Sequence, residues 1–161
     1  MPALYIVATP IGNLEDITLR ALRVLREARL IAAEDTRTTR KLLSHYDIHS
    51  PLTSYHDHNK TQKIPVILRA LDEGDVALVS DAGTPGISDP GLELVRAAID
   101  GGFSVVSIPG PSAVITALVV SGMSADHFLF LGFLPRRKGE RQGLLRSVSE
   151  LPYTIVLFEA P

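Results

Sequence analysis

Short continuous runs of hydrophobic residues alternate with segments of helical spacing along this chain. The runs at residues 4–8, 30–33, 76–79 and 105–108 predict strands, and the run at 76–79, all apolar and largely β-branched, is typical of a strand buried on both faces of a parallel sheet. Between them, apolar residues recur every three or four positions, which is typical of amphipathic helices. The alternation of strand and helix predicts an α/β fold with a mostly parallel sheet flanked by helices.

Local signals set the expected ends of the helices. Asp16 is placed to cap the first helix and Thr36 to cap the second, which runs through residue 43. The third helix has an apolar face that includes Leu68 and ends at Gly74. Two further helices are expected at 92–99 and 112–120, followed by a strand at 128–133.

The character of the chain changes after residue 134. Residues 135–141 are polar, basic and interrupted by proline and glycine, which is typical of a domain linker. A helix at 144–148 and a strand at 153–158 follow, too few elements for a separate core. We therefore expect an N-terminal α/β domain with cofactor-binding loops at 1–134. Residues 135–161 are expected to be a linker and the start of a truncated C-terminal α/β domain.

Composition narrows the class of protein. Hydrophobic residues make up 45% of the chain and charged residues 21%, which excludes a mostly disordered chain. The absence of cysteine excludes disulfides and thiolate metal sites and favours a reducing compartment, so we expect a cytoplasmic protein. The apolar run near the N-terminus is too short for a signal peptide or a membrane span, and no membrane association is expected.

Positive charge is concentrated in two places. The formal net charge of −2 argues against a surface that grips nucleic acid everywhere. Dense clusters nevertheless occur, and they could contact RNA phosphates. The first cluster is Arg136, Arg137, Lys138 and Arg141, and the second is Arg37, Arg40 and Lys41. Alternatively, the first cluster is part of a solvated linker and the second is a solvated helix face.

Four loops rich in small residues, glycine or proline follow predicted strands. They are residues 9–13, 34–37, 80–91 and 109–113. In an open parallel sheet, ligands bind in the crevice beyond the carboxyl ends of the strands, where these loops would gather. Any one of them could be an ordinary turn, but four at one edge predict a ligand site.

Several common sites are not supported. No G-x-G-x-x-G follows the first strand, and no phosphate-binding P-loop motif occurs. The segment 86–91 lacks the second glycine of a G-x-S-x-G nucleophile elbow because Pro90 takes its place. His56 and His58, like His45 and His49, are spaced as metal ligands can be, but no fourth ligand is evident and no metal is expected.

Several motifs in one order resemble the ribosomal RNA small subunit methyltransferase I family, which belongs to the tetrapyrrole methylase superfamily. They are TPIGNLEDIT (9–18), AEDTRTTRKLL (33–43), SYHDHN (54–59), SDAGTPGISDPG (80–91), PGPSA (109–113), GFLPRRKGER (132–141) and LFEAP (157–161). The resemblance covers essentially the whole chain. Lys60 departs from it, since that family more usually has an acid after HDHN.

The resemblance implies a tetrapyrrole methylase-like fold of two α/β domains with S-adenosyl-L-methionine in the cleft between them. It implies methylation of the ribose 2′-hydroxyl of a cytidine in the rRNA of the small ribosomal subunit, by a homodimer. The superfamily pattern places the cofactor against Pro10, Asp81, Ala82, Thr84, Ile87, Ser88, Ser112, Ala113 and Phe158. The basic cluster Arg136, Arg137, Lys138 and Arg141 would bind the RNA.

A ribose hydroxyl is a weak nucleophile, so a positioned base should assist it. Glu34, Asp35 and Arg37 are our catalytic candidates, and the alternative is a helix-capping carboxylate paired with Arg37. His56 is a second candidate base, or else an ordinary loop histidine.

Two other functions remain open. One is methylation of a corrin or porphyrin precursor by the same fold. The tetrapyrrole enzymes usually carry a first loop like G-x-G-P-G-D, which TPIGN does not match. The other is a non-catalytic module that binds a nucleotide or RNA with the same loops.

Overall fold

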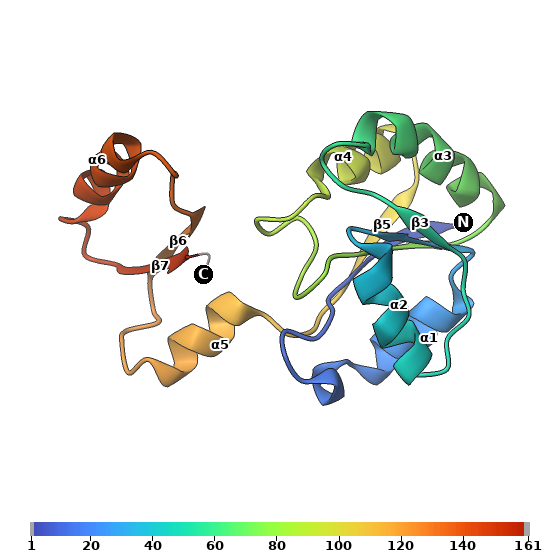
Figure 1. Cartoon of the computed structure of the whole chain (residues 1–161), viewed down its shortest axis with the longest axis horizontal. Helices are drawn as coiled ribbons and strands as arrows, with labels where there is room; N and C mark the ends of the chain where they lie inside the picture. The colour runs from blue at the N-terminus through green and yellow to red at the C-terminus, as the bar shows by residue number, and fades with distance from the viewer. Residues whose placement is uncertain (1, 160–161) are drawn as a thin grey trace. The chain divides into compact units, whose positions relative to one another are not determined.

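The computed structural model describes residues 2–159 and forms two compact units, Met1–Ser112 and Ala113–Pro161 (Figure 1). The elements of the first unit are β1 (Ala3–Val7), the short 3-10 helix η1 (Leu14–Asp16), α1 (Leu19–Glu27), β2 (Leu30–Ala33), α2 (Thr36–His45), β3 (Leu52–Ser54), α3 (Lys60–Glu73), β4 (Val76–Val79), α4 (Leu92–Asp100) and β5 (Ser104–Ile108). Strand and helix alternate throughout this unit, so its chain builds successive β-α-β connections.

The five strands form one parallel sheet in the order β3-β2-β4-β1-β5. Leu4 of β1 lies in register with Val76 on one side and Val105 on the other. All four residues of β4 are buried, as expected of a strand covered on both faces. The predicted α/β class with a mostly parallel sheet flanked by helices is confirmed.

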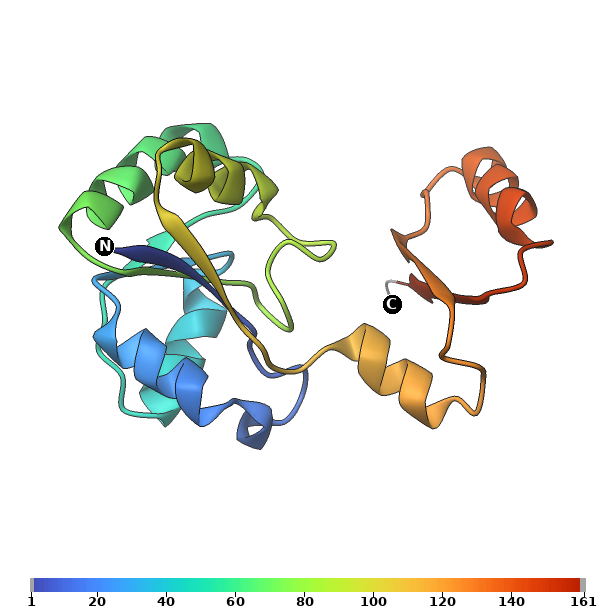
Figure 2. The same ribbon diagram turned by 180° about the vertical axis from the view of Figure 1, so that it is seen from behind.

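Helices cover both faces of this sheet, and each face has its own core (Figures 1 and 2). On one face, Leu25 of α1 and Leu43 of α2 pack with Ile31 of β2. On the other, Leu71 of α3 and Leu94 of α4 pack with strand residues. Complete burial of one such side chain contributes roughly 1.5–3 kcal/mol, so the two cores hold the sheet as a rigid base for its edge loops.

Two predicted helix caps are wrong by one or two residues. Asp16 lies in η1, and α1 is capped by Thr18, whose hydroxyl accepts a hydrogen bond from the N–H of Ala21 at 3.0 Å. The cap of α2 is Asp35, not Thr36. Both errors arise because several capping residue types stand side by side, and the backbone conformation decides which of them caps the helix.

The edge strand β3 has no counterpart in the sequence prediction. It is only three residues long, and all three are half-buried, so it lacks the long apolar run that marks the other strands. Its backbone pairs in parallel with β2. A strand this short is defined by its pairing with a neighbouring strand, and the local sequence pattern does not encode that pairing.

The second unit consists of α5 (Ala113–Val120), β6 (Phe128–Phe133), α6 (Lys138–Val148) and β7 (Thr154–Phe158). β6 and β7 pair in parallel and are connected through α6. The predicted linker 135–141 therefore runs into α6, which begins six residues earlier than the predicted helix 144–148. The predicted domain boundary after residue 134 falls between β6 and α6, and the division into domains 1–134 and 135–161 stays a prediction.

None of the helices within residues 2–159 is long and apolar enough to cross a lipid bilayer.

Candidate functional site

The first unit has a topological switch point between its neighbouring strands β1 and β4. From β1 the chain passes through α1 to β2, beyond β4, whereas from β4 it passes through α4 to β5, beyond β1. The loops that follow these two strands therefore diverge and leave a crevice at the carboxyl edge of the sheet. Residues 9–13 and 80–91, two of the predicted ligand loops, flank this crevice.

The two loops are joined by an antiparallel β-bridge between Thr9 and Gly83. The N–H of Thr9 donates to the carbonyl of Gly83 at 2.9 Å, and the N–H of Gly83 donates back to Thr9 at 3.0 Å. The hydroxyl of Thr9 also donates to the carbonyl of Ser80 at 3.2 Å. The start of the long loop is thereby fastened to the end of β1.

Backbone geometry within the long loop explains part of its composition. Gly83 has a φ of +84°, in the left-handed region that glycine adopts without strain. Ser88 has a φ of +60°, which is uncommon for a residue with a Cβ and is often found at functional positions. Ile87 beside it leaves half of its side chain exposed. The loop thus presents an apolar side chain and a hydroxyl residue to a ligand.

The loop after β5 approaches the end of β1 closely at Gly110. A Cβ built on Gly110 would lie 2.9 Å from the Cβ of Ala8, closer than real Cβ atoms come. The absence of a side chain therefore lets the 109–112 backbone run against the first loop. Three loops thus meet at one edge of the sheet.

The structure places the predicted cofactor residues as follows. Pro10, Asp81, Ala82, Thr84, Ile87, Ser88 and Ser112 lie on the three loops at the carboxyl edge of the first unit, whereas Ala113 begins α5 and Phe158 ends β7 in the second unit. Seven of the nine residues therefore share one edge of one sheet. Their role in cofactor binding stays a prediction.

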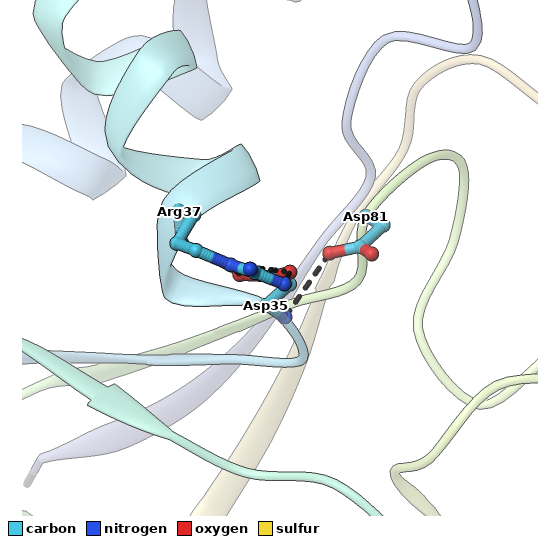
Figure 3. A network of polar contacts seen from close by, with 3 residues as sticks. All are labelled: Asp35, Arg37 and Asp81. Carbon is cyan, nitrogen blue, oxygen red and sulfur yellow. Dashed lines mark hydrogen bonds and ion pairs between the residues drawn. The ribbon is translucent and has the colours of Figure 1, made fainter.

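The loops after β2 and β4 hold each other through reciprocal hydrogen bonds. The N–H of Asp35 donates to the carboxylate of Asp81 at 3.1 Å (Figure 3). The N–H of Asp81 donates to the carboxylate of Glu34 at 3.4 Å. These two hydrogen bonds join residues that lie 46 and 47 positions apart in the sequence. The three carboxylates lie at the edge where the other ligand loops gather.

Asp35 and Arg37 form a fork-shaped ion pair (Figure 3). Arg37 Nη2 donates to Asp35 Oδ2 at 2.6 Å, and the backbone N–H of Arg37 donates to Asp35 Oδ1 at 2.7 Å. These bonds lower the pKa of Asp35 to about 2, so it is a weak base at neutral pH. This geometry favours the capping interpretation for these two residues.

Glu34 differs from its neighbour. Burial raises its pKa, and the carboxylates of Asp89 and Asp81 raise it further, while the N–H of Asp81 opposes the shift. A carboxylate with a raised pKa accepts a proton more readily. Among the three predicted catalytic residues, Glu34 therefore has the electrostatic character of a general base.

Asp89 is a further ionisable residue that the sequence prediction missed. Burial raises its pKa and a hydrogen bond with Ser80 opposes that shift. The sequence places Asp89 in the long loop, which was already a predicted ligand loop. Its burial could not be predicted, because it depends on how that loop folds back.

His56, the second candidate base, is held by Asn59. The N–H of His56 donates to Asn59 Oδ1 at 2.9 Å, and the ring Nε2 lies 3.1 Å from Asn59 Nδ2. Its Nδ1 is buried and has no hydrogen-bond partner among the described residues. Among those same residues, no three histidine or acidic side chains gather as a metal site would require.

A pocket of about 310 Å³ opens beside the first loop. It lies between that loop, one side of α2 and the start of the long loop. Its polar lining includes Thr9, Thr39 and Ser80, each at most 3% exposed. The sequence prediction did not identify this pocket, because the motif AEDTRTTRKLL places Thr38 and Thr39 on α2 but does not reveal which side chains of that helix face the first loop.

The second unit contains its own hollow of about 570 Å³. Arg136 and Arg141 line it together with Phe158, whose ring packs against Phe130 at 4.9 Å between centroids. Arg137 and Lys138 are exposed at the start of α6, where the positive end of the helix dipole adds to their charge. The four basic residues of the predicted RNA-binding cluster thus lie around the start of α6, where Arg137 is paired with Glu140 at 3.2 Å. Their role in RNA binding stays a prediction.

Comparison with known proteins decides the family. The model of the Tetrapyrrole (Corrin/Porphyrin) Methylases matches residues 3–161. The chain belongs to this family. It is 54% identical over 159 residues to a ribosomal RNA small subunit methyltransferase I from Halalkalibacterium halodurans, with 98% of the chain and 55% of that protein covered. It is 51% identical over 158 residues to the protein of the same name from Escherichia coli O157:H7, again covering 98% and 55%.

These relatives confirm the resemblance seen in the motifs, and the chain spans about half their length. Among solved structures, the native form of uroporphyrin III C-methyltransferase from Thermus thermophilus is similar with a TM-score of 0.67 and 20% identity, covering 96% of this chain and 69% of that one. A second structure of uroporphyrin-III-C-methyltransferase from that organism gives 0.60 and 22%, covering 83% and 60%. At these identities the structures support the fold of this tetrapyrrole methylase and not its substrate.

Proposed function

We propose that the protein carrying this chain is an S-adenosyl-L-methionine-dependent methyltransferase that modifies the ribose 2′-hydroxyl of a cytidine in small-subunit rRNA. The observation that carries this proposal is the identity of 51–54%, along 98% of the chain, to proteins named ribosomal RNA small subunit methyltransferase I. The lack of a G-x-G-P-G-D loop after β1 supports RNA over a tetrapyrrole substrate.

The edge of the first unit fits the cofactor. The Thr9–Gly83 bridge and the close approach of Gly110 to Ala8 leave backbone groups and small side chains along the crevice, so a ligand with polar ends can approach the chain closely. Asp81 would accept hydrogen bonds from it, and Ile87 would pack on its apolar parts. When bound, S-adenosyl-L-methionine supplies an electrophilic methyl group on a sulfonium.

The residues around the crevice would act mainly by positioning. An in-line displacement gains most of its rate when the nucleophile is held in line at contact distance. Glu34 would accept the proton of the ribose hydroxyl at its carboxylate, since its raised pKa suits it to that task better than Asp35. Arg37 would keep Asp35 and the start of α2 in place.

The basic surface of the second unit would hold the RNA backbone. Arg136, Arg137, Lys138 and Arg141 can neutralise phosphates without reading sequence. Such contacts would fix the register of the RNA, while the first unit carries the chemistry.

Transfer of tritium from labelled S-adenosyl-L-methionine tests the proposal. The full-length protein should label small ribosomal subunits that lack the modification, and nuclease digestion should place the label on a 2′-O-methylcytidine. A uroporphyrinogen acceptor in place of the subunits should remain unlabelled. Labelling of the macrocycle alone would support the tetrapyrrole alternative, and RNA binding without any transfer would support the non-catalytic module.

Replacement of Asp81 tests the cofactor edge. We expect Asp81→Ala in the full-length protein to weaken cofactor binding about tenfold, because a hydrogen bond to a charged group contributes roughly 1.5–3 kcal/mol. Calorimetry would measure the affinity, with Asp72→Ala on the exposed side of α3 as the control. An unchanged affinity for Asp81→Ala would contradict this placement.

The resemblance also predicts a cytoplasmic homodimer. Light scattering of the full-length protein after size-exclusion chromatography would measure its mass and test the dimer.

A further inference from the structure

The pocket beside the first loop has the build of a binding site rather than of a packing gap. Its volume of about 310 Å³ is at the lower end of the range for small-molecule pockets. Pro10, Leu14 and Leu42 give it apolar walls. Three polar side chains buried to at least 97%, Thr9, Thr39 and Ser80, are also part of its lining. Apolar walls with a few placed polar groups are typical of sites for small planar ligands.

Thr39 supplies an independent sign of a ligand. Its Oγ1 is buried and has no hydrogen-bond partner among the described residues. A buried hydroxyl without a partner is destabilising, and such groups call for an explanation. Threonine in a helix occupies two χ1 rotamers, so the hydroxyl of Thr39 can change its direction by rotation about Cα–Cβ. A ligand with a hydrogen-bonding edge would then provide the missing partner.

The charged residues around the pocket indicate what kind of ligand it fits. Lys41 lines the pocket, and Arg40 is exposed next to it on α2, so phosphates of a bound polynucleotide would find positive charge there. Asp81 lines the opposite side. Carboxylates accept hydrogen bonds from the exocyclic amino group of cytosine, and a threonine hydroxyl can bond either donors or acceptors of a base edge. The volume of about 310 Å³ is large enough to admit a single base.

We infer that this pocket receives the cytosine base of the nucleotide to be methylated, turned out of the RNA strand. This inference rests on the proposed function. Pro10 and Asp81 belong both to the pocket and to the predicted cofactor loops, so a base seated here would leave its ribose at the edge where the methyl donor is expected. Enzymes that act on one nucleotide of a folded RNA commonly need it unstacked from its neighbours.

A bulky substitution at the pocket lining tests the inference. Thr38 lines the pocket from α2 but is itself exposed, so Thr38→Trp should obstruct the pocket without disturbing the core. In the full-length protein, this variant should raise KM for unmodified small subunits at least tenfold, because the indole would occupy the space that the base is expected to enter. Its affinity for S-adenosyl-L-methionine should stay within twofold of the wild-type value. Ser44→Trp, exposed on the same helix outside the pocket lining, is the matched control and should behave as wild type.

Two outcomes would overturn the inference. If Thr38→Trp leaves KM for the subunits unchanged, no base enters the pocket. If cofactor affinity falls together with RNA affinity in Thr38→Trp but not in Ser44→Trp, the pocket belongs to the cofactor.

Direct titration separates failure of this inference from failure of the proposed function. If the wild-type protein transfers no methyl group to RNA, the proposed function fails, and the pocket is then tested with free nucleosides. Cytidine should shift the amide NMR signals of Thr38, Thr39 and Lys41 in the isotope-labelled wild-type protein, and Thr38→Trp should abolish these shifts. Uridine, which lacks the amino group, should bind at least fivefold more weakly. Equal binding of both nucleosides, or shifts elsewhere only, would overturn the assignment.

Discussion

The adjacent acidic residues Glu34 and Asp35 at the end of β2 have pKa values shifted in opposite directions, raised for Glu34 and lowered for Asp35. Asp35 is held by Arg37 only two residues away, whereas Glu34 is partly buried and lies near Asp81 and Asp89 from the loop after β4. The sequence could place all of these residues at the edge of one sheet. It could not rank them, because the burial of Glu34 depends on a loop more than forty residues away.

Glu34 should matter for the chemical step. We expect Glu34→Gln to lower kcat for RNA methylation about 100-fold at pH 7, because general base catalysis contributes roughly 10²–10⁴-fold. The variant retains an oxygen that can accept from Asp81, so cofactor affinity should hold. Asp35→Asn, which keeps a capping side chain, should lose less than fivefold. Equal losses for both variants in single-turnover kinetics would contradict this ranking.

The raised pKa of Glu34 also predicts a pH dependence of stability. Because the folded-state pKa lies above the ordinary value of 4.5, ionisation of Glu34 costs folding free energy as the pH rises through that value. Glu34→Gln removes this cost. The difference in Tm between variant and wild type should therefore shift in favour of the variant from pH 4 to pH 7. Thermal unfolding followed by circular dichroism would measure it, and a shift in the opposite direction would refute the assigned direction of the pKa.

At the scale of elements, hydrophobic runs predicted four of the five strands of the sheet. β1, β2 and β4 are largely buried, whereas the edge strand β5 leaves Ser104 and Ser107 exposed and was predicted from its valine and isoleucine residues. The hydrophobic runs missed β3 because three half-buried residues make no pattern of their own. The carboxyl-edge loops were also predictable, because parallel strands bring their ends together. The pairing of Thr9 with Gly83 was not, since it depends on how the long loop turns back toward β1.

Gly83 tests the role of that pairing. With a φ of +84°, Gly83→Ala should destabilise the protein by about 1–2 kcal/mol through backbone strain and should weaken cofactor binding by displacing the bridge. Gly102→Ala is the matched control, because Gly102 has a φ of +78° and open space around its Cβ position before β5. Denaturation should show similar losses of stability in both variants, and calorimetry should show weaker cofactor binding in Gly83→Ala alone. Weaker binding in both would mean that general stability, not the bridge, sets the affinity.

At the scale of the whole molecule, charge is uneven although its sum is close to zero. The chain has a formal net charge of −2 and yet carries a basic cluster at the start of α6. The sequence identified this cluster but interpreted its surroundings as a linker. Proline, glycine and charge dominate residues 135–141, so the local composition did not reveal that α6 begins at Lys138.

Neutralising that cluster should act on RNA alone. In the full-length protein, replacing Arg136, Arg137 and Lys138 together with alanine should weaken RNA binding and reduce the slope of log K against log salt by up to about 2–3, since each phosphate contact contributes roughly 0.7–0.9. Cofactor affinity should not change. The control replaces three arginines exposed on other helices: Arg20, Arg69 and Arg96. A parallel loss of cofactor affinity in the cluster variant would show that the cluster supports the fold instead.

The bridge between Thr9 and Gly83 also indicates whether the long loop becomes ordered during folding or only when a ligand binds. Both of its hydrogen bonds join backbone groups that are almost inaccessible to water, so these two amides should exchange their hydrogens as slowly as those of the central strands. The loop would then be ordered during folding and not by its ligand. Binding avoids the entropic cost of fixing a free loop, and a preorganised site can gain affinity without any additional contact.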